Sequence, residues 1–396
     1  MRSRRRRGGP LPGPLPRLPR TRHLSRAVSI RGRLPVDVTH GSTRRRARPR
    51  SDRCARVKRG NPNGAFLATA RGEQAERRPL WIMRQAGRYL PEYREMRSKL
   101  SFLELCRNPE AAAEVTLQPL RRYDIDAAIL FTDLLVPVEP MGIELAYEPG
   151  PVLAKTVATI EDVAALRIPE PEADLAAMLG TATLVREELA ADKALIGFVG
   201  APFTMACYLV EGRGSKSWDG VRRLMFEAPD VFDALLVRIA ECLEPLVGAL
   251  VEAGCDAIQV FDSWASALSP GDWAERCAPH SERLLAAARR AGAVSIHYVN
   301  GAAQHFGRMR EADTDILAFD WRLPMRQARA MAPLRTLQGN MEPAALFADE
   351  SLLRQRVTQV CADAGDRHVF NLGHGISRHA DPRALEIVVD EVRRSR

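Results

Sequence analysis

From about residue 64 onward, short runs of apolar residues alternate with longer stretches in which apolar residues recur at helical spacing. The short runs are largely apolar rather than alternating, a pattern typical of strands buried on both faces of a parallel sheet. The Ala/Leu/Arg/Glu-rich stretches between them predict helices, among them Asp230–Ala253 and Asp272–Ala291. The predicted strands are Leu80–Arg84, Asp126–Phe131, Leu195–Gly200, Asp256–Phe261, Val294–Val299, Ile316–Trp321, Thr336–Asn340 and His368–Gly373.

These eight strands alternate with helical stretches, which indicates an α/β chain folded as a single (β/α)8 barrel of the TIM type. The barrel would occupy residues 64–396 as one domain. A doubly wound open sheet is the alternative, because it also alternates strands with helices. Against that alternative, no Gly-x-Gly-x-x-Gly follows the first predicted strand, and the later strands recur at regular intervals.

Polar and glycine-rich residues follow nearly every predicted strand. Barrel enzymes place their chemistry at the carboxyl ends of the strands, so we expect the functional site to be built from these positions. Packing alone does not require polar residues at so many strand ends. The positions are Arg84, Asp133, Gly200–Pro202, Asp262–Ser263, Asn300, Asp320–Trp321, Gln338–Asn340 and Gly373–Gly375.

The positive charge of the chain is concentrated in its first 60 residues. The chain has a formal net charge of +9, yet residues 1–60 hold 20 of its 58 Lys and Arg residues and only two acids, Asp37 and Asp52. The remaining residues are mildly acidic, with 38 basic and 47 acidic side chains. Residues 1–60 are rich in Arg and Pro without an amphipathic period, which predicts a disordered extension. An organellar transit peptide, a nucleic-acid-binding arm and sequence upstream of the true start remain open for this segment.

Composition argues against several classes of protein. No apolar run approaches the ~18 residues that span a bilayer, so we expect no membrane partner. The seven cysteines are scattered without a Cys-x-x-Cys pair, which disfavours a disulfide framework or zinc finger and fits a reducing cytoplasm. No aromatic residues are interleaved with the Arg runs, so we expect no nucleic-acid partner. The chain also lacks a P-loop and an His-Glu-x-x-His motif, and we predict no metal site.

The segment "WIMRQAGRYLPEYREMR" places several arginines directly after an apolar strand. Arg84 and Arg88 are four residues apart, so on a helical turn they would project from the same side. Gln85 adds an amide, and Ala86–Gly87 would let the backbone approach a ligand closely. Arginines that share a pocket select for polycarboxylates or phosphates, because charge-assisted hydrogen bonds are the strong ones. The alternative is a solvated face, or ion pairs with Glu92 and Glu95.

Asp133 and Tyr208 are the next candidates. Asp133 is a lone carboxylate among apolar residues, where burial should raise its pKa unless a cation or N–H donors oppose the rise. It could hold N–H groups or a developing positive charge; the alternative is an N-cap or strand-end role. Tyr208 lies two turns into a helix predicted to begin at Pro202 after a Gly-Ala-Pro turn. Its phenol could reach a pocket, or the ring could belong to the core.

Two further candidates lie at later strand ends. Ser263 could contact a ligand or cap a helix. His374 lies between two glycines in "NLGHGI", where exposed backbone N–H groups favour an anion, and a core position is the alternative. His374 and His379 are five residues apart, which is not the helical spacing of a metal-binding pair.

Several motifs together resemble the uroporphyrinogen decarboxylase family. "PLWIMRQAGRYLPEYREMR" and "GFVGAPFTMACYLVEG" are similar to its two hallmark segments. The likeness covers about residues 64–396 and leaves the basic extension outside. It continues in the family's order through "TLQPLRRYDIDAAILFTDLL", "IQVFDSWA", "FDW", "LQGNMEP" and "NLGHGI".

The resemblance implies a fold, an activity and a set of residues. Members of the family remove carbon dioxide from the four acetate side chains of uroporphyrinogen III, giving coproporphyrinogen III in haem biosynthesis. They form a single distorted (β/α)8 barrel, usually dimerise, and need no cofactor or metal. The implied catalytic residues are Asp133, Arg84 and Tyr208. The implied substrate-binding residues are Arg84, Gln85, Ala86, Gly87, Arg88, Arg97, Asp133, Tyr208, Ser263 and His374.

Three rival functions remain to be weighed. Zinc- and cobalamin-linked methyltransferases resemble the decarboxylase, but they rely on a His-x-Cys after the fifth strand. Here His297 is followed by Tyr298-Val299, so the soft zinc ligands are missing. A non-catalytic tetrapyrrole carrier would need the arginines but neither Asp133 nor Tyr208. A nucleic-acid-binding protein would depend on the basic extension alone.

Overall fold

The computed structural model describes residues 60–147 and 150–395, all of which belong to one compact unit. The predicted disordered extension therefore lies outside the described residues, except for its last residue. Gly60 is buried, and its N–H donates to the Asp256 carboxylate at 2.8 Å.

Seven parallel strands form one sheet, and each strand pairs with its neighbours in chain order. Strand order does not reverse anywhere in this sheet, so the doubly wound alternative is wrong. A separate antiparallel pair, which the sequence did not predict, joins β2 (Leu145–Tyr147) to β3 (Pro151–Leu153). The parallel strands are β1 (Ala127–Ile129), β4 (Ala194–Gly200), β5 (Ala257–Asp262), β6 (Val294–Val299), β7 (Ile316–Phe319), β8 (Thr336–Met341) and β9 (His368–Leu372).

The first predicted strand, Leu80–Arg84, is reduced to a single parallel bridge between Leu80 and Phe370. The Phe370 N–H donates to Pro79 at 2.8 Å, and the Asp126 N–H donates to Leu80 at 2.8 Å. The segment therefore lies between β9 and the start of β1. It cannot continue as a strand because the chain turns sharply at Ile82–Gln85. The described sheet has seven strands where the sequence predicted eight.

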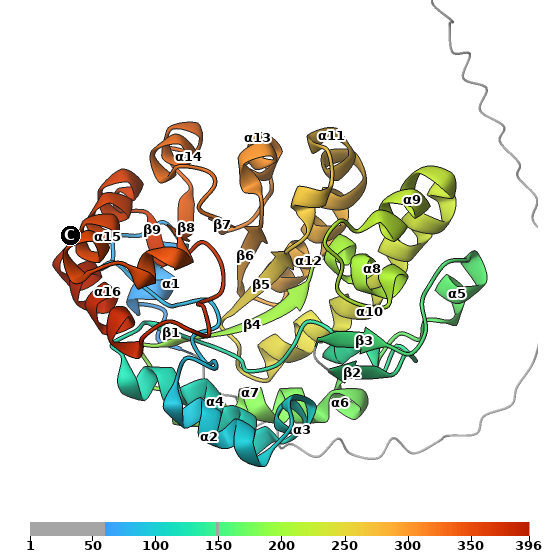
Figure 1. Cartoon of the computed structure of the whole chain (residues 1–396), viewed down its shortest axis with the longest axis horizontal. Helices are drawn as coiled ribbons and strands as arrows, with labels where there is room; N and C mark the ends of the chain where they lie inside the picture. The colour runs from blue at the N-terminus through green and yellow to red at the C-terminus, as the bar shows by residue number, and fades with distance from the viewer. Residues whose placement is uncertain (1–59, 148–149, 396) are drawn as a thin grey trace, which may run out of the picture. The chain divides into compact units, whose positions relative to one another are not determined.

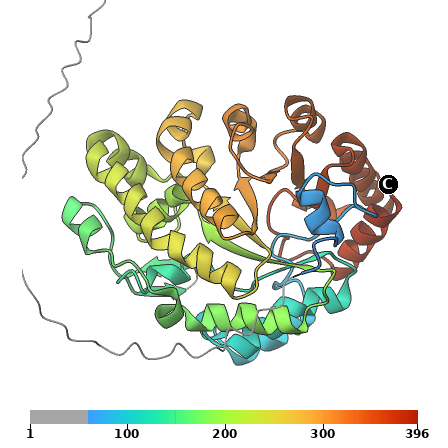
Figure 2. The ribbon, with the colours of Figure 1, turned by 180° about the vertical axis from the view of Figure 1, so that it is seen from behind.

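Helices flank the sheet on its outside, as Figures 1 and 2 show from opposite sides. No helix among residues 60–147 and 150–395 is long and apolar enough to cross a membrane. The helices are α1 (Ala65–Ala70), α2 (Pro91–Lys99), α3 (Phe102–Arg107), α4 (Pro109–Arg122), α5 (Ile160–Ala165), α6 (Pro171–Asp174), α7 (Ala176–Glu188), α8 (Pro202–Glu211), α9 (Asp219–Glu227), α10 (Pro229–Glu252), α11 (Pro270–Asp272), α12 (Ala278–Arg290), α13 (Phe306–Met309), α14 (Met325–Met331), α15 (Glu350–Ala364) and α16 (Pro382–Arg394). The short 3-10 turns are η1 (Val136–Val138), η2 (Ala265–Ala267), η4 (Ala302–Gln304) and η5 (Pro343–Phe347), and η3 (Trp273–Cys277) is a π-helical turn.

Local sequence signals account for the helix boundaries near the site. α8 begins at Pro202, as predicted, because proline has no N–H to leave unpaired in the first turn. It ends at Gly212, whose φ of 71° is in the left-handed region that favours glycine. The predicted helix Asp230–Ala253 is confirmed as α10, shifted by one residue. The predicted helix Asp272–Ala291 is confirmed as α12 together with the η3 turn before it.

Buried carboxylates secure the amino-terminal ends of the strands. Asp256, which precedes β5, accepts the Leu195 N–H and the Gly60 N–H at 2.9 and 2.8 Å. It also accepts a hydrogen bond from buried Arg186 at 2.9 Å. Asp126, which precedes β1, accepts the Leu80 N–H at 2.8 Å. At this end of the sheet the acids therefore support the fold and have their partners within the protein.

An aromatic layer lies inside the sheet near the carboxyl ends of its strands. Phe198, Phe261 and Tyr298 meet edge to face, with ring centroids 5.5 and 5.4 Å apart. The Tyr298 hydroxyl donates to the Gly373 carbonyl at 2.9 Å, which ties β6 to the loop after β9. Phe198 is only half-buried. The strand ends therefore present an apolar floor, above which the candidate site is built.

Candidate active site

Arg84 occupies a tight turn with an unusual backbone. Its φ of 62° is in the left-handed region, which non-glycine residues rarely adopt and which clusters at functional sites. Bonds on both sides hold the turn. The Met83 N–H donates to Asn371 at 2.9 Å, and the Met83 carbonyl accepts the Ile376 N–H at 2.9 Å. Arg84 is thereby fixed beside the loop after β9, and its side chain is exposed.

Gln85 holds this turn and does not present its amide to a ligand. Its side chain is fully buried, its carbonyl accepts the Ile82 N–H at 3.0 Å, and its NH2 group donates to the Ala127 carbonyl at 3.1 Å. The prediction that the Gln85 amide helps to bind an anion is therefore wrong. The predicted helical turn that would align Arg84 with Arg88 is also absent, because residues 81–90 form two separate turns.

Glycines let the chain pack closely around Arg84. A Cβ atom at Gly375 would collide with the Arg84 side chain, coming within 2.8 Å of its Cγ. A Cβ at Gly87 would come within 2.9 Å of the Arg84 carbonyl oxygen. Gly87 therefore serves the fold of the turn, and the close approach of its backbone to a ligand stays a prediction. Ala86 beside it is half-buried.

Asp133 follows β1 and keeps one carboxylate oxygen unpaired. Its Oδ1 accepts the Leu135 N–H at 2.9 Å and the hydroxyl of Tyr147. Its Oδ2 has no hydrogen-bond partner among the described residues. Burial raises the pKa of Asp133 above its ordinary value, while Tyr147, the Leu135 N–H and Arg84 oppose the rise. The predicted pKa direction is confirmed, and Oδ1 has the predicted local role at the strand end. Oδ2 remains available, so the role of holding N–H groups or a positive charge stays a prediction.

Tyr208 lies on α8 and belongs to an aromatic cluster. Its ring centroid is 5.1 Å from that of Trp218 and 6.3 Å from that of Trp264. Burial raises the pKa of the Tyr208 phenol, and electrostatic interactions link it to Asp133 and Arg84. The ring therefore packs against the core, as one of the two alternatives predicted. The phenol also interacts electrostatically with the Asp133 carboxylate.

Ser263 follows β5 and caps no helix. Its N–H donates to the Thr204 hydroxyl at 2.9 Å, and its carbonyl accepts from Asn300 at 3.1 Å. The η2 turn begins after Trp264 without a side-chain cap. The capping alternative is therefore wrong, and the Ser263 hydroxyl has no hydrogen-bond partner in the described part of the chain.

His374 follows β9 and is a neutral imidazole at physiological pH. Burial and, to a smaller extent, the positive charges of Arg84 and Arg322 lower its pKa to about 4, against the attraction of Asp320. Asp320 is fully buried and accepts a hydrogen bond from Arg322 at 2.5 Å. His374 can therefore donate or accept a hydrogen bond here without adding positive charge.

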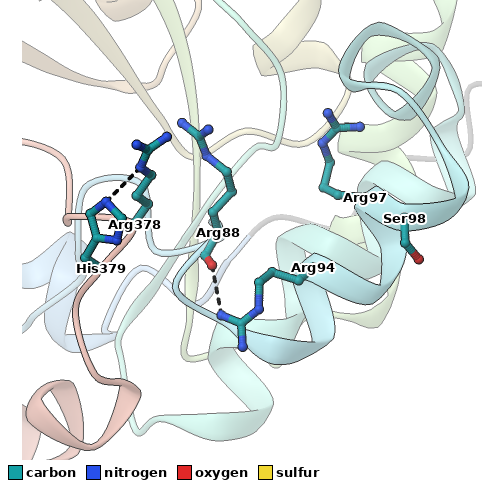
Figure 3. A pocket seen from close by; sticks show the side chains of 6 residues that line it. All are labelled: Arg88, Arg94, Arg97, Ser98, Arg378 and His379. Carbon is teal, nitrogen blue, oxygen red and sulfur yellow. Dashed lines mark hydrogen bonds between the residues drawn. The ribbon is translucent and has the colours of Figure 1, made fainter. Parts of the chain in front are cut away.

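Arginines from two distant segments line a pocket of about 450 Å³. In Figure 3 the guanidinium groups of Arg88, Arg97 and Arg378 point to the same side. Arg94 turns back and donates to the Arg88 carbonyl at 3.0 Å. None of these four arginines forms an ion pair with a carboxylate of the described residues. The residues lining this pocket, which we call the arginine pocket, are Arg88, Arg94, Arg97, Ser98, Arg378 and His379.

The predicted alternative of internal ion pairs in this segment is wrong. Glu92 is 3.7 Å from Arg122, and Glu95 is 2.8 Å from Lys99, so both glutamates have other partners. Among the described residues, two arginines of the pocket donate hydrogen bonds to backbone carbonyls, and all four lie close to one another without a carboxylate partner. A carboxylate or phosphate is the ligand class that such unpaired guanidinium groups bind most strongly.

The predicted site residues fall into three groups. Arg84, Asp133, Tyr208 and His374 are linked by electrostatic interactions, and Ser263 lies next to the Trp264 that contacts Tyr208. Arg88 and Arg97 line the arginine pocket. Gln85 and Gly87 build the turn that carries Arg84.

Three functional candidates were missing from the sequence prediction. Tyr147 binds Asp133 from the β2–β3 pair, and Arg378 and His379 complete the arginine pocket. Their sequence offered little signal, because the β2 strand has only three residues and residues 378–379 follow the last motif. The described residues contain no cluster of three or more His, Cys, Asp or Glu side chains that could hold a metal ion.

The site combines an ionisable acid with excess positive charge. A polyanionic ligand would meet Arg84 and the arginine pocket, while Asp133 would face an N–H group or a cation on the same ligand. The apolar floor of Phe198 and Phe261 suits a flat, largely apolar body. The arrangement therefore fits a large ring that carries several carboxylates.

Known proteins resemble this chain in sequence and in fold. The sequence model of a family described as "Uroporphyrinogen decarboxylase (URO-D)" matches residues 61–395. The chain is 44% identical over 335 residues to the uroporphyrinogen decarboxylases of Trichlorobacter lovleyi and Geobacter sulfurreducens, covering 84% of this chain and 98% of each relative. A solved methyltransferase from Methanosarcina mazei is similar in fold, with a TM-score of 0.72 and 18% identity, covering 84% of this chain and 98% of that chain. At that identity the methyltransferase shows the fold alone.

Proposed function

The chain belongs to the uroporphyrinogen decarboxylase family, and we propose that its site converts uroporphyrinogen III to coproporphyrinogen III by removing carbon dioxide from four acetate side chains. It is a carboxy-lyase of haem biosynthesis. The proposed site rests on one observation, the hydrogen bonding of the two carboxylate oxygens of Asp133. One of its oxygens is held by Leu135 and Tyr147, the other is unpaired, and the positive charge of Arg84 acts on the carboxyl.

Substrate binding follows from charge. Uroporphyrinogen carries eight carboxylates, whereas the chain beyond residue 60 is mildly acidic, so productive binding needs concentrated positive charge. Arg84, Arg88 and Arg97 supply it without competing carboxylates. The unpaired Oδ2 of Asp133 accepts the N–H groups of the pyrrole rings and orients the ring system over the apolar floor.

Decarboxylation needs a place for the electrons of the broken bond. A proton adds to a ring carbon of the pyrrole that bears the reacting acetate, and the ring becomes cationic. The bond between the acetate methylene and its carboxylate then breaks, its electron pair passes into the ring, and carbon dioxide leaves. A proton adds to the methylene carbon and the ring proton departs, which leaves a methyl group. The net reaction consumes one proton for each carbon dioxide.

Asp133 stabilises the cationic ring in this scheme. Its negative charge is present before the reaction and lies where positive charge develops, which is the arrangement that lowers a barrier most. The protein's own residues supply this stabilisation, so the reaction needs no cofactor or metal. Arg84 holds the reacting substrate near Asp133 through its carboxylates, and Tyr208, Ser263 and His374 contact the ring and its substituents.

The proposal extends to fold closure and assembly. The hydrogen bonds of residues 79–81 to β9 and to Asp126 support an eighth, abbreviated strand that closes the (β/α)8 barrel. A homodimer is supported by large apolar side chains that are more than half exposed, at Phe226, Leu334 and Phe347. A cytoplasmic location is supported by the buried free thiols of the described cysteines. Sedimentation of the purified protein tests the dimer.

The decisive experiment follows the reaction directly. Purified protein is incubated without oxygen with chemically reduced uroporphyrinogen III, with and without EDTA, and the products are oxidised and separated by carboxylate number. We expect stepwise appearance of species with seven to four carboxylates, at equal rates in both conditions. No product in either condition would overturn the proposed function. Activity lost with EDTA and restored by a metal would overturn only its cofactor-free part.

A further inference from the structure

We propose that Arg378, together with His379, completes an outer subsite in the arginine pocket that holds carboxylate side chains of the substrate that are not reacting. This inference rests on the proposed function. The pocket combines two segments about 280 positions apart in sequence, Arg88–Ser98 and Arg378–His379. No motif of the sequence assigns a role to the second segment.

The arginine pocket adjoins the candidate active site along both segments. Arg84 and Gly375 touch each other, and the pocket begins four residues after Arg84 and three residues after Gly375. Four residues reach at most about 14 Å, so Arg88 cannot lie far from Arg84. A ring that carries carboxylates around its edge can therefore place one beside Asp133 and others in the pocket.

The orientation of Arg378 suits a carboxylate ligand. Its Nε donates to Nε2 of His379 at 3.0 Å, which leaves its terminal NH2 groups without a hydrogen-bond partner among the described residues. Arg88 and Arg97 point their guanidinium groups to the same side as Arg378 (Figure 3). Arg94 is engaged by the backbone carbonyls of Arg88 and Tyr89 at 3.0 Å and contributes its charge.

The pocket is the right size for part of the substrate. Its volume of about 450 Å³ is within the range of small-molecule sites, yet its lining contains no carboxylate and no large apolar side chain. Carboxylate-bearing arms fit this lining better than the ring itself does. Arms held there stay bound while another arm reacts at Asp133. The pocket should therefore strengthen binding of substrate, intermediates and product alike, and should not affect the chemical step.

Kinetics of Arg378→Ala test this inference. We expect the KM for uroporphyrinogen to rise about 3- to 10-fold with kcat unchanged, because one partly exposed charged contact is lost. Inhibition by coproporphyrinogen should weaken by a similar factor, and Arg378→Lys should recover part of the affinity. Arg383→Ala is the matched control, since it removes the same charge from an exposed position outside the pocket.

The outcomes separate this inference from the proposed function. An unchanged KM in Arg378→Ala, with normal turnover, would overturn the outer subsite and leave the decarboxylase intact. Equal KM increases in Arg378→Ala and Arg383→Ala would also overturn it, because long-range attraction alone would then explain the effect. Absence of turnover in the unmodified protein would instead refute the proposed function itself.

Discussion

Replacing Tyr147 with phenylalanine should raise the pKa of Asp133 and move the acid side of the activity profile toward neutral pH. The Tyr147 hydroxyl donates to Oδ1 of Asp133 and stabilises the ionised carboxylate against burial. The phenyl ring of the variant keeps the edge-to-face contact of Tyr147 with Phe102, whose centroids are 4.8 Å apart. The substitution therefore removes the hydrogen bond with little loss of packing.

The magnitude follows from the bond that is lost. A hydrogen bond to a charged group contributes about 1.5–3 kcal/mol, and the remaining Leu135 N–H and the partial exposure of Asp133 favour the lower figure. About 1.4 kcal/mol changes the ratio of ionised to protonated carboxylate tenfold. Below the pKa of Asp133, kcat/KM should therefore fall about tenfold. At alkaline pH, where Asp133 is ionised in both proteins, the loss should be much smaller.

The assay is the pH dependence of kcat/KM for uroporphyrinogen. Substrate carboxylates also titrate, but they do so identically for every variant, so a difference between variants reports the enzyme. Other groups that interact electrostatically with Asp133 are Arg84, Tyr208 and Cys106, and all three remain in place. An acid limb that does not move, in a variant that unfolds normally, would refute the role of Tyr147.

A second tyrosine provides the control for this prediction. Tyr123 donates its hydroxyl to the Pro382 carbonyl at 3.2 Å, with no interaction with Asp133. Tyr123→Phe removes one buried phenol as well, so its effect on the free energy of unfolding should resemble that of Tyr147→Phe. The pH profile should stay unchanged in this control. A shift of equal size in both variants would show that lost stability, and not the Asp133 contact, moves the profile.

Three further changes test other parts of the structure. Asp133→Asn should keep the melting temperature and lose most turnover, and near-normal rates would remove Asp133 from the mechanism. Gly375→Ala should displace the Arg84 side chain and lower kcat/KM about tenfold with little effect on thermal unfolding, because the collision involves a flexible side chain. Asp256→Asn should reduce the free energy of unfolding in urea by about 3 kcal/mol, since it leaves Arg186 buried without its ion-pair partner, while specific activity of the folded protein stays unchanged.

Strands and long helices could be predicted because their signals are local. Largely apolar runs such as Val294–Val299 are buried on both faces, so the run itself indicates the strand, and β6 has the predicted bounds. α10 is likewise marked by periodic apolar residues and by Pro229 in its first turn. The failure at Leu80–Arg84 has a tertiary cause. The left-handed φ of Arg84 depends on bonds to Asn371 and Ile376, which no local window contains.

Three of the predicted site residues were marked by their place at a strand end. Asp133, Ser263 and His374 follow apolar strands, so position and residue type together marked them. Tyr147 lies on a three-residue strand outside the parallel sheet, and its partner is known only from the fold. Arg378 required a contact between segments that are far apart in sequence. Gln85 was misjudged because its position in the motif suggested a ligand contact. The sequence alone does not show that its side chain points into the fold.

Acid side chains at the two ends of the sheet differ in how completely they are paired. At the amino end, Asp256 engages both oxygens with two backbone N–H groups and with Arg186. At the carboxyl end, Asp133 is half-buried and leaves Oδ2 without a partner in the described part of the chain, although partial burial still carries a desolvation cost. If Asp133 were required only for the fold, leaving one oxygen unpaired would bring no benefit to offset the desolvation cost. The unpaired oxygen is explained if a ligand supplies the missing donors, and the N–H groups of a pyrrole ring are donors of the right kind.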